Sequence, residues 1–228
     1  TPTQIICVSF IIVIALGTLL LTLPIASRHG RLDVLNAMFT ATSATCVTGL
    51  VVRDTWTQFT WFGQAVVLLL IQVGGLGLVT LTSFFALAMR RRMGFRDLRL
   101  LGESVSADGY DQAKSVLKIV VGLAAMFEGI GILLLLFAFV PQFGLEGVWI
   151  SVFTAISAFC NAGFDLFGRF GAYSSLAPYV NNYYVQAVIM FMIISGGLGF
   201  MVWVELCQWY QKRRLSCLLY TSDAADEE

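Results

Sequence analysis

Four apolar stretches, each about 19–25 residues long, constrain the fold of this chain more than any other feature. They run over residues 5–23, 65–89, 116–140 and 185–207, and we expect Pro24 to end the first and Pro141 the third. About 20 apolar residues in a helix span the hydrocarbon core of a bilayer. The composition agrees, because 58% of the residues are hydrophobic and 12% are charged, about half the charge of an average soluble domain. The sequence therefore predicts an all-α membrane protein embedded in a lipid bilayer.

The basic residues are distributed unevenly around these four spans. Ten lie between the second and third spans, at their ends, or after the fourth: Arg90, Arg91, Arg92, Arg96, Arg99, Lys114, Lys118, Lys212, Arg213 and Arg214. Four lie on the other side: Arg28, Arg31, Arg53 and Arg169. Because basic loops stay on the cytoplasmic side, we expect a multi-pass protein of the inner (plasma) membrane with a cytoplasmic N-terminus. The loops over residues 24–64 and 141–184 then face outward.

Each outward loop contains a further, shorter apolar stretch, over residues 34–46 and 148–160. Thirteen residues in a helix reach about 20 Å, which is short of a hydrocarbon core about 30 Å thick. Both stretches are too apolar for an exposed loop, so we expect two re-entrant helices that enter and leave on the outer side. Irregular backbone at that depth is tolerated only where protein buries it or where it lines an aqueous path, which favours a pore.

The two outward loops are also related in sequence. Residues 39–50 recur as residues 153–164 with an offset of 114, and seven of the twelve positions are identical. Gln64-Ala65-Val66 and Gly74-Gly75-Leu76-Gly77 recur with an offset of 122, as residues 186–188 and 196–199. The chain thus divides into two units with the order span, re-entrant helix, span: residues 1–112, which end in a cytoplasmic linker, and residues 113–215. Because two spans return the chain to the same side, the repeats are expected to be parallel, related by an axis along the membrane normal.

A turn of small residues follows each re-entrant helix, with glycine at the same position: Val47-Thr48-Gly49 and Asn161-Ala162-Gly163. Glycine gives the backbone freedom and adds no Cβ. It therefore suits a strand whose carbonyl oxygens replace the hydration shell of a monovalent cation. The negative C-terminal ends of the two helices would also favour a cation. Ordinary helix-stopping glycines are the alternative, which their occurrence at two equivalent positions weakens.

These motifs resemble the Trk/Ktr/HKT superfamily of potassium transporters. The resemblance rests on residues 39–50 and 72–77 in the first unit and on residues 157–164 and 195–200 in the second. The segments over residues 2–27 and 51–63 are most similar to the Ktr membrane subunit, KtrB. The resemblance covers residues 1–215 and implies half of a potassium-channel-like fold, in which four such units surround one pore.

The resemblance implies potassium uptake through a selectivity filter of backbone carbonyls. It assigns this role to Val47, Thr48, Gly49 and Leu50 in the first unit and to Asn161, Ala162, Gly163 and Phe164 in the second. Glycine at position 49, where some plant members have serine, favours potassium over sodium. The third and fourth units, and the gating loop of the third, are not in this sequence. We therefore expect that this chain alone does not conduct.

The resemblance further implies partners and a coupling ion. A cytosolic nucleotide-binding regulatory subunit (KtrA/TrkA-like) would meet the cytoplasmic face, and a homodimer is expected. A Ktr-like system would depend on sodium, whereas a Trk-type proton-linked transporter is the alternative within the superfamily. Neither a cofactor nor a nucleic-acid partner is expected.

Both ends of the chain resemble the edges of a sequencing fragment. From Cys217 onward the sequence is similar to the conceptual translation of a transposase sequencing adapter, so we expect residues 216–228 not to be native. The chain also begins at Thr1 without a methionine. These features predict that the natural protein is longer.

Function classes other than transport find less support in the sequence. An intramembrane enzyme needs a nucleophile with its base, or metal ligands, at membrane depth. The chain has one histidine, outside the spans, and five cysteines without a CxxC pair, which argues against a zinc site. A non-conducting scaffold subunit is the other alternative, and it would have no need of the repeated glycine. The sequence therefore predicts a transport protein and not an enzyme.

Two features of the spans leave alternatives open. Glu128 lies in the middle of the third span, where an acid is costly. It either takes part in function or pairs with a polar group of another span. The glycines of residues 74–77 and 196–199 either let helices pack closely or bend them to widen an inner vestibule.

Overall fold

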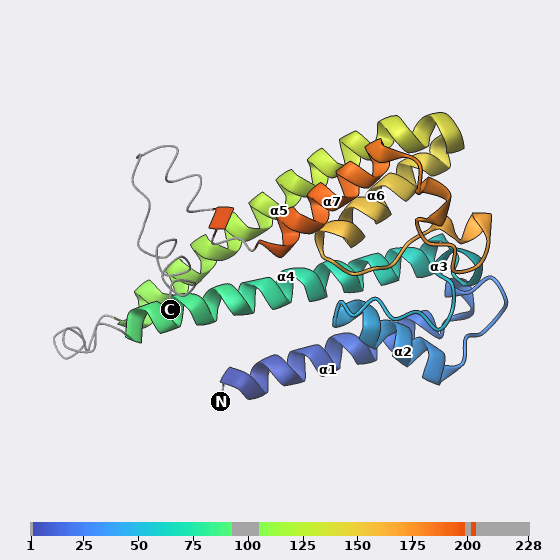
Figure 1. The fold of residues 1–228 in the computed structure, drawn as a ribbon. Coiled ribbons are helices and arrows are strands. Elements are labelled where there is room, and N and C mark those ends of the chain that lie inside the picture. The colour runs from blue at the N-terminus through green and yellow to red at the C-terminus, as the bar shows by residue number, and fades with distance from the viewer. Residues whose placement is uncertain (1, 93–104, 199–201, 204–228) are drawn as a thin grey trace, which may run out of the picture.

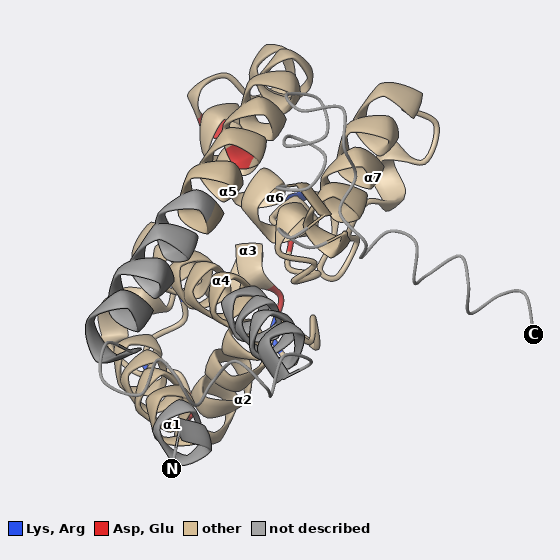
Figure 2. Cartoon of the chain, turned by 90° about the vertical axis from the view of Figure 1, so that its left-hand side faces the viewer, with Lys and Arg blue, Asp and Glu red and all other residues tan. Residues whose placement is uncertain are grey.

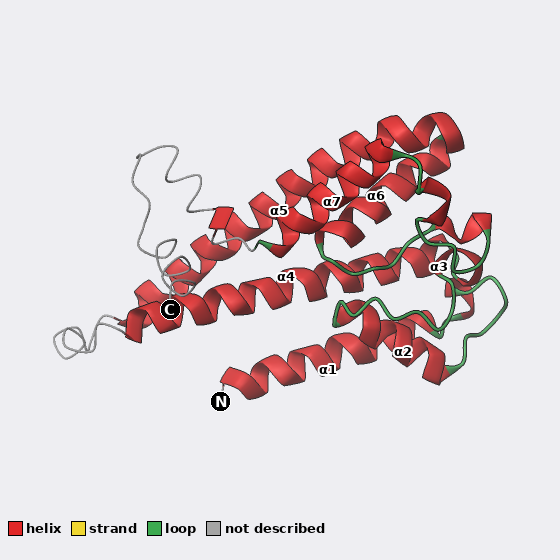
Figure 3. Cartoon of the chain, viewed as in Figure 1, coloured by secondary structure: helices red, strands yellow, loops and turns green. Residues whose placement is uncertain are grey.

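The structure is a computed structural model that describes residues 2–92, 105–198 and 202–203, and within these residues it contains helices and loops but no strand (Figures 1 and 3). The α-helices are α1 (Pro2–Leu21), α2 (Val34–Thr45), α3 (Thr55–Gln58), α4 (Trp61–Arg92), α5 (Val105–Phe143), α6 (Leu145–Phe159) and α7 (Tyr183–Gly197). Three short 3-10 helices are η1 (Pro24–Ala26), η2 (Phe167–Phe170) and η3 (Ala177–Tyr179). Gly199, most of the linker after Arg92 and the predicted tail over residues 216–228 lie outside the described residues.

The helices form over apolar stretches of the sequence. Each stretch is followed by residues that break a helix. The short helices α2 and α6 lie on the two short apolar stretches, α1, α4 and α5 lie on the first three long ones, and α7 lies on residues 185–197 of the fourth. Residues 199–201 and 204–207 of that fourth stretch lie outside the described residues. One prediction was wrong, because α5 continues through Pro141 to Phe143. A proline in the last turn removes only one backbone hydrogen bond of the helix. The helix instead ends just before Gly144, which adopts a φ of 61° that glycine tolerates best.

By length and composition, Val120–Phe143 within α5 is the one described helical segment that can cross a membrane. Four shorter apolar helices accompany it in the described part of the chain: Cys7–Leu21, Trp61–Gly77, Leu145–Phe159 and Tyr183–Gly197. The lipid-spanning role of all four predicted stretches therefore stays a prediction.

The helices pack as two groups that meet along α4. Helices α1, α2 and α4 contact one another, as do α5, α6 and α7, while α4 also contacts α5 and α6. In Figure 1, α1 and α5 run in one direction and α4 and α7 in the opposite one. Figure 2 colours few Lys, Arg, Asp or Glu positions on the described parts of these helices. The buried core is correspondingly apolar and continuous across both groups.

Polar contacts also join the two groups. The Gln72 side chain on α4 donates a hydrogen bond of 2.8 Å to the Glu128 carboxylate on α5, and Glu128 is 8% exposed. This confirms the interpretation that Glu128 pairs with a polar group of another helix. Trp149 of α6 donates to the buried Gln64 of α4 at 2.8 Å and stacks on Trp61. Each of these contacts links α4 to the second group.

The loops at one end of the molecule are held together around Asp54 (Figure 3). This buried carboxylate caps α3 by accepting from the backbone N–H of Thr57 at 2.8 Å. It also accepts from the backbone N–H of Tyr173 at 3.0 Å, in the loop that follows α6. Nearby, the guanidinium groups of Arg28 and Arg169 both lie over the ring of Trp56. The first loop and the second therefore pack together as one cap, in which α3 contacts η2.

Candidate functional site

The C-terminal end of α2 adopts a Schellman motif, in which backbone N–H groups beyond the helix bond carbonyls of its last turn. The N–H of Thr48 donates to the carbonyl of Ser43 at 3.0 Å, and the N–H of Val47 donates to that of Ala44 at 3.3 Å. Val47 takes the left-handed position with a φ of 56°. The motif turns the chain sharply out of the helix and into the segment over residues 47–50.

The end of α6 has the same motif at the positions related by the offset of 114. The N–H of Ala162 donates to the carbonyl of Ser157 at 2.8 Å, and the N–H of Asn161 donates to that of Ala158 at 3.1 Å. Asn161 has a φ of 57°. The two segments that the sequence singled out, residues 47–50 and 161–164, thus leave their helices with the same geometry.

The glycines of the two segments lie beyond the helix stop. Gly49 has a φ of 73° and Gly163 a φ of 71°, while Thr48 and Ala162 between them and the helix stop have negative φ. The residues that stop the helices are Val47 and Asn161, so the alternative that Gly49 and Gly163 are ordinary helix-stopping glycines is wrong. The sign of φ therefore alternates along each segment from the helix stop to the glycine.

The two segments approach each other at their glycines. A Cβ placed on Gly49 would lie 2.9 Å from the carbonyl oxygen of Ala162 and 3.4 Å from the Cα of Gly163. A Cβ on Gly163 would lie 3.2 Å from the Cα of Gly49. Glycine is therefore required here twice over, for its positive φ and for the close approach of two backbones.

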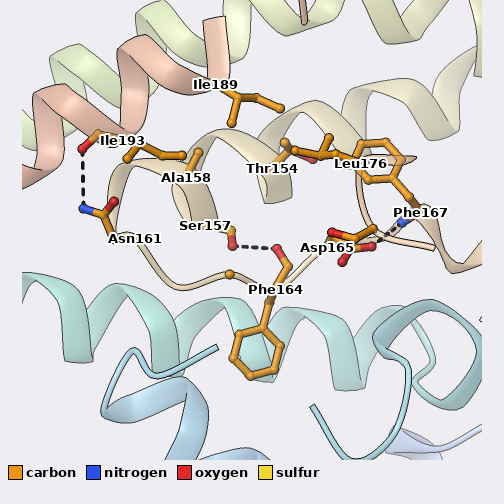
Figure 4. A pocket seen from close by; sticks show the side chains of 12 residues that line it. Thr154, Ser157, Ala158, Asn161, Phe164, Asp165, Phe167, Leu176, Ile189 and Ile193 are labelled. Atoms are coloured by element: carbon orange, nitrogen blue, oxygen red, sulfur yellow. Dashed lines mark hydrogen bonds between the residues drawn. The ribbon is translucent and has the colours of Figure 1, made fainter. Parts of the chain in front are cut away.

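Hydroxyl groups of the two helices support the segments from behind. Ser43 on α2 and Thr48 share a hydrogen bond of 2.9 Å between their hydroxyls. At the position equivalent to Ser43, the hydroxyl of Ser157 on α6 donates at 2.6 Å to the carbonyl oxygen of Phe164 (Figure 4). The fourth residues of the two segments differ, because Leu50 is 61% exposed whereas Phe164 is 3% exposed and turns its ring toward α4 (Figure 4).

Glycines of α4 and α7 pack against the C-terminal ends of the two short helices α2 and α6. A Cβ on Gly74 of α4 would lie 2.7 Å from the carbonyl carbon of Thr45, the last residue of α2. A Cβ on Gly196 of α7 would lie 2.8 Å from that of Phe159, the last residue of α6. Both would overlap the carbonyl oxygen itself. Gly75 similarly faces Cys160, whose Sγ would be 2.6 Å away.

Close packing at these glycines confirms one of the two interpretations of the repeated motif. The close-packing interpretation applies to Gly74, Gly75 and Gly196. Helix α4 also continues unbroken through its own glycines. Gly77 and Gly197 have no such contact, because the nearest atoms would be 3.9 Å and 3.8 Å from their Cβ.

Val47 carries backbone strain that its counterpart does not. A β-branched residue is a genuine outlier at positive φ, whereas asparagine is among the residues that tolerate it. We therefore expect Val47→Asn, which installs the residue found at position 161, to raise the free energy of unfolding by about 1 kcal/mol. The measurement is thermal unfolding in detergent, with Ala162→Asn as a control at negative φ. A stability unchanged or lowered by Val47→Asn would contradict the strain.

The described residues contain no group of three or more His, Cys, Asp or Glu side chains that could hold a metal ion. The cysteines among them, Cys7, Cys46 and Cys160, are free thiols. Sequence reasoning missed Ser43 and Ser157, although their identity at the offset of 114 was a signal that could have found them. It also missed Asp54 and Asp165, which have no repeated counterpart.

Comparison with known proteins places this geometry in context. The family model described as "Cation transport protein", TrkH, matches residues 1–225. The potassium/sodium uptake protein NtpJ of Enterococcus hirae is 35% identical over 218 residues, which are 95% of this chain and 47% of that protein. The Ktr system potassium uptake protein B of Bacillus subtilis is 39% identical over 203 residues, or 89% of this chain and 44% of that protein. Its namesake in Vibrio alginolyticus is 36% identical, covering 92% of this chain and 45% of that protein. The chain therefore spans about half the length of the curated relatives that it matches.

Proposed function

This chain belongs to the TrkH family of cation transport proteins, and on that premise we propose that it forms part of a potassium uptake pathway. Val47, Thr48, Gly49 and Leu50, together with Asn161, Ala162 and Gly163, line the pathway with backbone carbonyls, while the carbonyl of Phe164 is held by the Ser157 hydroxyl. Carbonyls in that role replace the hydration shell of the permeating ion. The whole filter then includes further segments from the part of the protein that this chain does not contain.

One observation carries this proposal: the alternating sign of φ in two segments whose glycines face each other. Val47 and Gly49 in one segment, and Asn161 and Gly163 in the other, have φ between 56° and 73°. Backbone strain of this kind concentrates at functional sites. Since a structural turn needs only one left-handed residue, the second one in each segment supports a role in presenting carbonyls.

The proposal includes a membrane topology. Residues 1–112 and 113–215 are two parallel units, in which α1, α4, α5 and α7 cross the membrane and α2 and α6 enter it only from the outer side. The excess of basic residues after α4 and around the start of α5 places these ends in the cytoplasm. The N-terminus is then cytoplasmic, and the cap around Asp54 faces outward.

The complete transporter is proposed to work as a Ktr-like system. Two of the relatives carry that name and cover a similar share of this chain. On this basis the transporter depends on sodium, forms a homodimer and binds a cytosolic nucleotide-binding regulatory subunit. A Trk-type, proton-linked transporter is the second candidate, and replacing sodium by choline separates the two, because only the Ktr-like system would lose uptake.

Uptake by the full-length natural protein tests the proposal. We expect the protein to restore growth in low potassium to a host that lacks potassium uptake, and to take up rubidium in competition with potassium. Sodium at the same concentration should compete at least about tenfold less well, which corresponds to about 1.4 kcal/mol of discrimination. A well-expressed protein that takes up no rubidium, even with its regulatory subunit, would contradict the transport function, and equal competition by sodium would contradict the potassium filter.

A further inference from the structure

A cavity of about 200 Å³ lies beside the second segment, between α6, α7 and the loop that follows α6. Figure 4 shows it from close by, with Asn161 and Ile193 at one side and Thr154, Asp165 and Leu176 at the other. The ring of Phe164 points away from it, toward α4. A water molecule takes about 30 Å³ in the liquid, so the space is large enough for several waters or for one ion with part of its hydration shell.

Thr154 lines this cavity, and its buried hydroxyl has no hydrogen-bond partner. The side chain is 6% exposed, and its Oγ1 is one of the few buried polar atoms of the described residues that lack a partner. Thr40, its equivalent at the offset of 114, instead donates at 2.9 Å to the carbonyl of Asn36 in its own helix. Buried polar groups are nearly always satisfied, so the hydroxyl of Thr154 is available to a bound species in a way that the hydroxyl of Thr40 is not.

Asp165 adds a carboxylate to the same cavity. One of its oxygens accepts from the backbone N–H of Phe167 at 2.9 Å, and the hydroxyl of Ser175 lies within reach of the carboxylate. Burial, and secondarily the nearby Asp54, raise the pKa of Asp165 above its ordinary value. Within the described part of the chain, the one ion pair joins Arg169 to Glu146, so no basic side chain there neutralises Asp165. A partly buried carboxylate without a counter-charge is costly.

We propose that this cavity binds an alkali-metal cation between the Thr154 hydroxyl and the Asp165 carboxylate, with water completing its coordination. Hydroxyl and carboxylate oxygens are the ligands that hard cations take. A single carboxylate matches a single positive charge, and the absence of a three-residue acidic cluster among the described residues disfavours a divalent ion. The cation would satisfy both the orphan hydroxyl and the uncompensated carboxylate.

A cation at this place would act on the neighbouring segment. Asp165 directly follows Phe164, whose carbonyl accepts the hydrogen bond from Ser157, and Asn161 at the start of the segment also lines the cavity. Binding would therefore fix both ends of residues 161–165 against α6. The inference goes beyond the proposed function, because the cation binds here whether or not ions pass through the protein.

Thermal unfolding of the full-length protein in detergent tests this site. Sodium chloride and potassium chloride would be titrated separately into choline chloride at constant ionic strength. We expect a saturable rise in melting temperature, whose midpoint moves to about tenfold higher cation concentration in Thr154→Val, since one lost oxygen partner of a charged species has about that effect. In Asp165→Asn the part of the response that Thr154→Val shifts should disappear, because the neutral amide carries no charge. The cation whose titration has its midpoint at the lower concentration is the one that the site prefers.

Thr40→Val is the matched control, because it removes the equivalent hydroxyl where that group bonds its own helix. It should leave both titrations unchanged. Any stabilisation that persists in Asp165→Asn reports cations bound elsewhere, such as in the proposed filter, so loss of one site is distinguishable from loss of the other. If either variant fails to fold, thallium soaked into crystals of the wild type should give anomalous density between Thr154 and Asp165. Identical titrations for wild type, Thr154→Val and Asp165→Asn, or a cavity without thallium, would overturn the proposal.

Discussion

Gly196→Ala is expected to destabilise the protein and to abolish ion uptake. The new methyl group would overlap the backbone carbonyl of Phe159, and a backbone atom has no alternative rotamer through which to move away. Overpacking of this kind costs about 1–3 kcal/mol or more, which exceeds the roughly 1 kcal/mol that alanine gains over glycine inside a helix. To relieve the overlap, α6 must shift, and residues 161–164 shift with it. The measurements are the melting temperature in detergent and rubidium uptake by the full-length protein.

Gly129→Ala provides the matched control for this prediction. Gly129 lies inside α5, and a Cβ there would meet nothing within 4 Å. This variant should be as stable as the wild type or more stable, by up to about 1 kcal/mol. Gly74→Ala should behave like Gly196→Ala, because its Cβ overlaps the carbonyl of Thr45. If Gly196→Ala and Gly129→Ala had the same stability and uptake, the packing of α7 against the end of α6 would not be what positions the second segment.

Gly49→Ser is expected to lower the preference for potassium over sodium by about tenfold or more. Serine at a φ of 73° costs about 1–3 kcal/mol of backbone strain, and its Cβ would also press on the carbonyl of Ala162 at 2.9 Å. A distortion of about 1.4 kcal/mol in the relative binding of two ions already changes their ratio tenfold. The measurement is rubidium uptake in competition with potassium and with sodium.

Gly30→Ser is the control that separates the backbone strain of serine at positive φ from the effect of its location beside the two segments. Gly30 has a φ of 87°, and a Cβ there would meet nothing within 4 Å, so the substitution carries the conformational penalty without a contact near the two segments. It should lower the melting temperature and leave the potassium preference unchanged. A Gly49→Ser protein that kept the wild-type preference would remove Gly49 from the filter, whatever its stability.

Most of the fold could be predicted from the sequence because it depends on patterns of many residues. The apolar stretches predict the positions of all the long helices, since burial and length decide those. The recurrence of residues 39–50 and 74–77 predicts that α2 and α6 end in the same way, which the paired Schellman motifs confirm. The same patterns and the resemblance identified a transport protein rather than an enzyme, in agreement with the TrkH family match.

The remaining features depend on single atoms in three dimensions, which a pattern does not contain. Nothing in the sequence says that Val47 rather than Gly49 stops α2, because valine is disfavoured at positive φ and only the packing of the helix end requires it there. Thr40 and Thr154 are identical in sequence, yet one bonds its own helix and the other faces a cavity. The partner of Glu128 on α4 likewise depends on how two distant helices align. Pro141 was misjudged because a proline near the end of a helix removes only a single bond.

The contacts of Gly74 and Gly196 pack the backbone of each short helix directly against another helix, α2 against α4 and α6 against α7. Side chains between two helices can absorb a small displacement by changing rotamer, but a carbonyl oxygen seated on a glycine Cα has no such freedom. A displacement of α4 or α7 is therefore expected to move Thr45 or Phe159 with it. A force acting about 20 Å or more away, the length of several helical turns, can in this way reshape the segments over residues 47–50 and 161–164 without any ligand touching them.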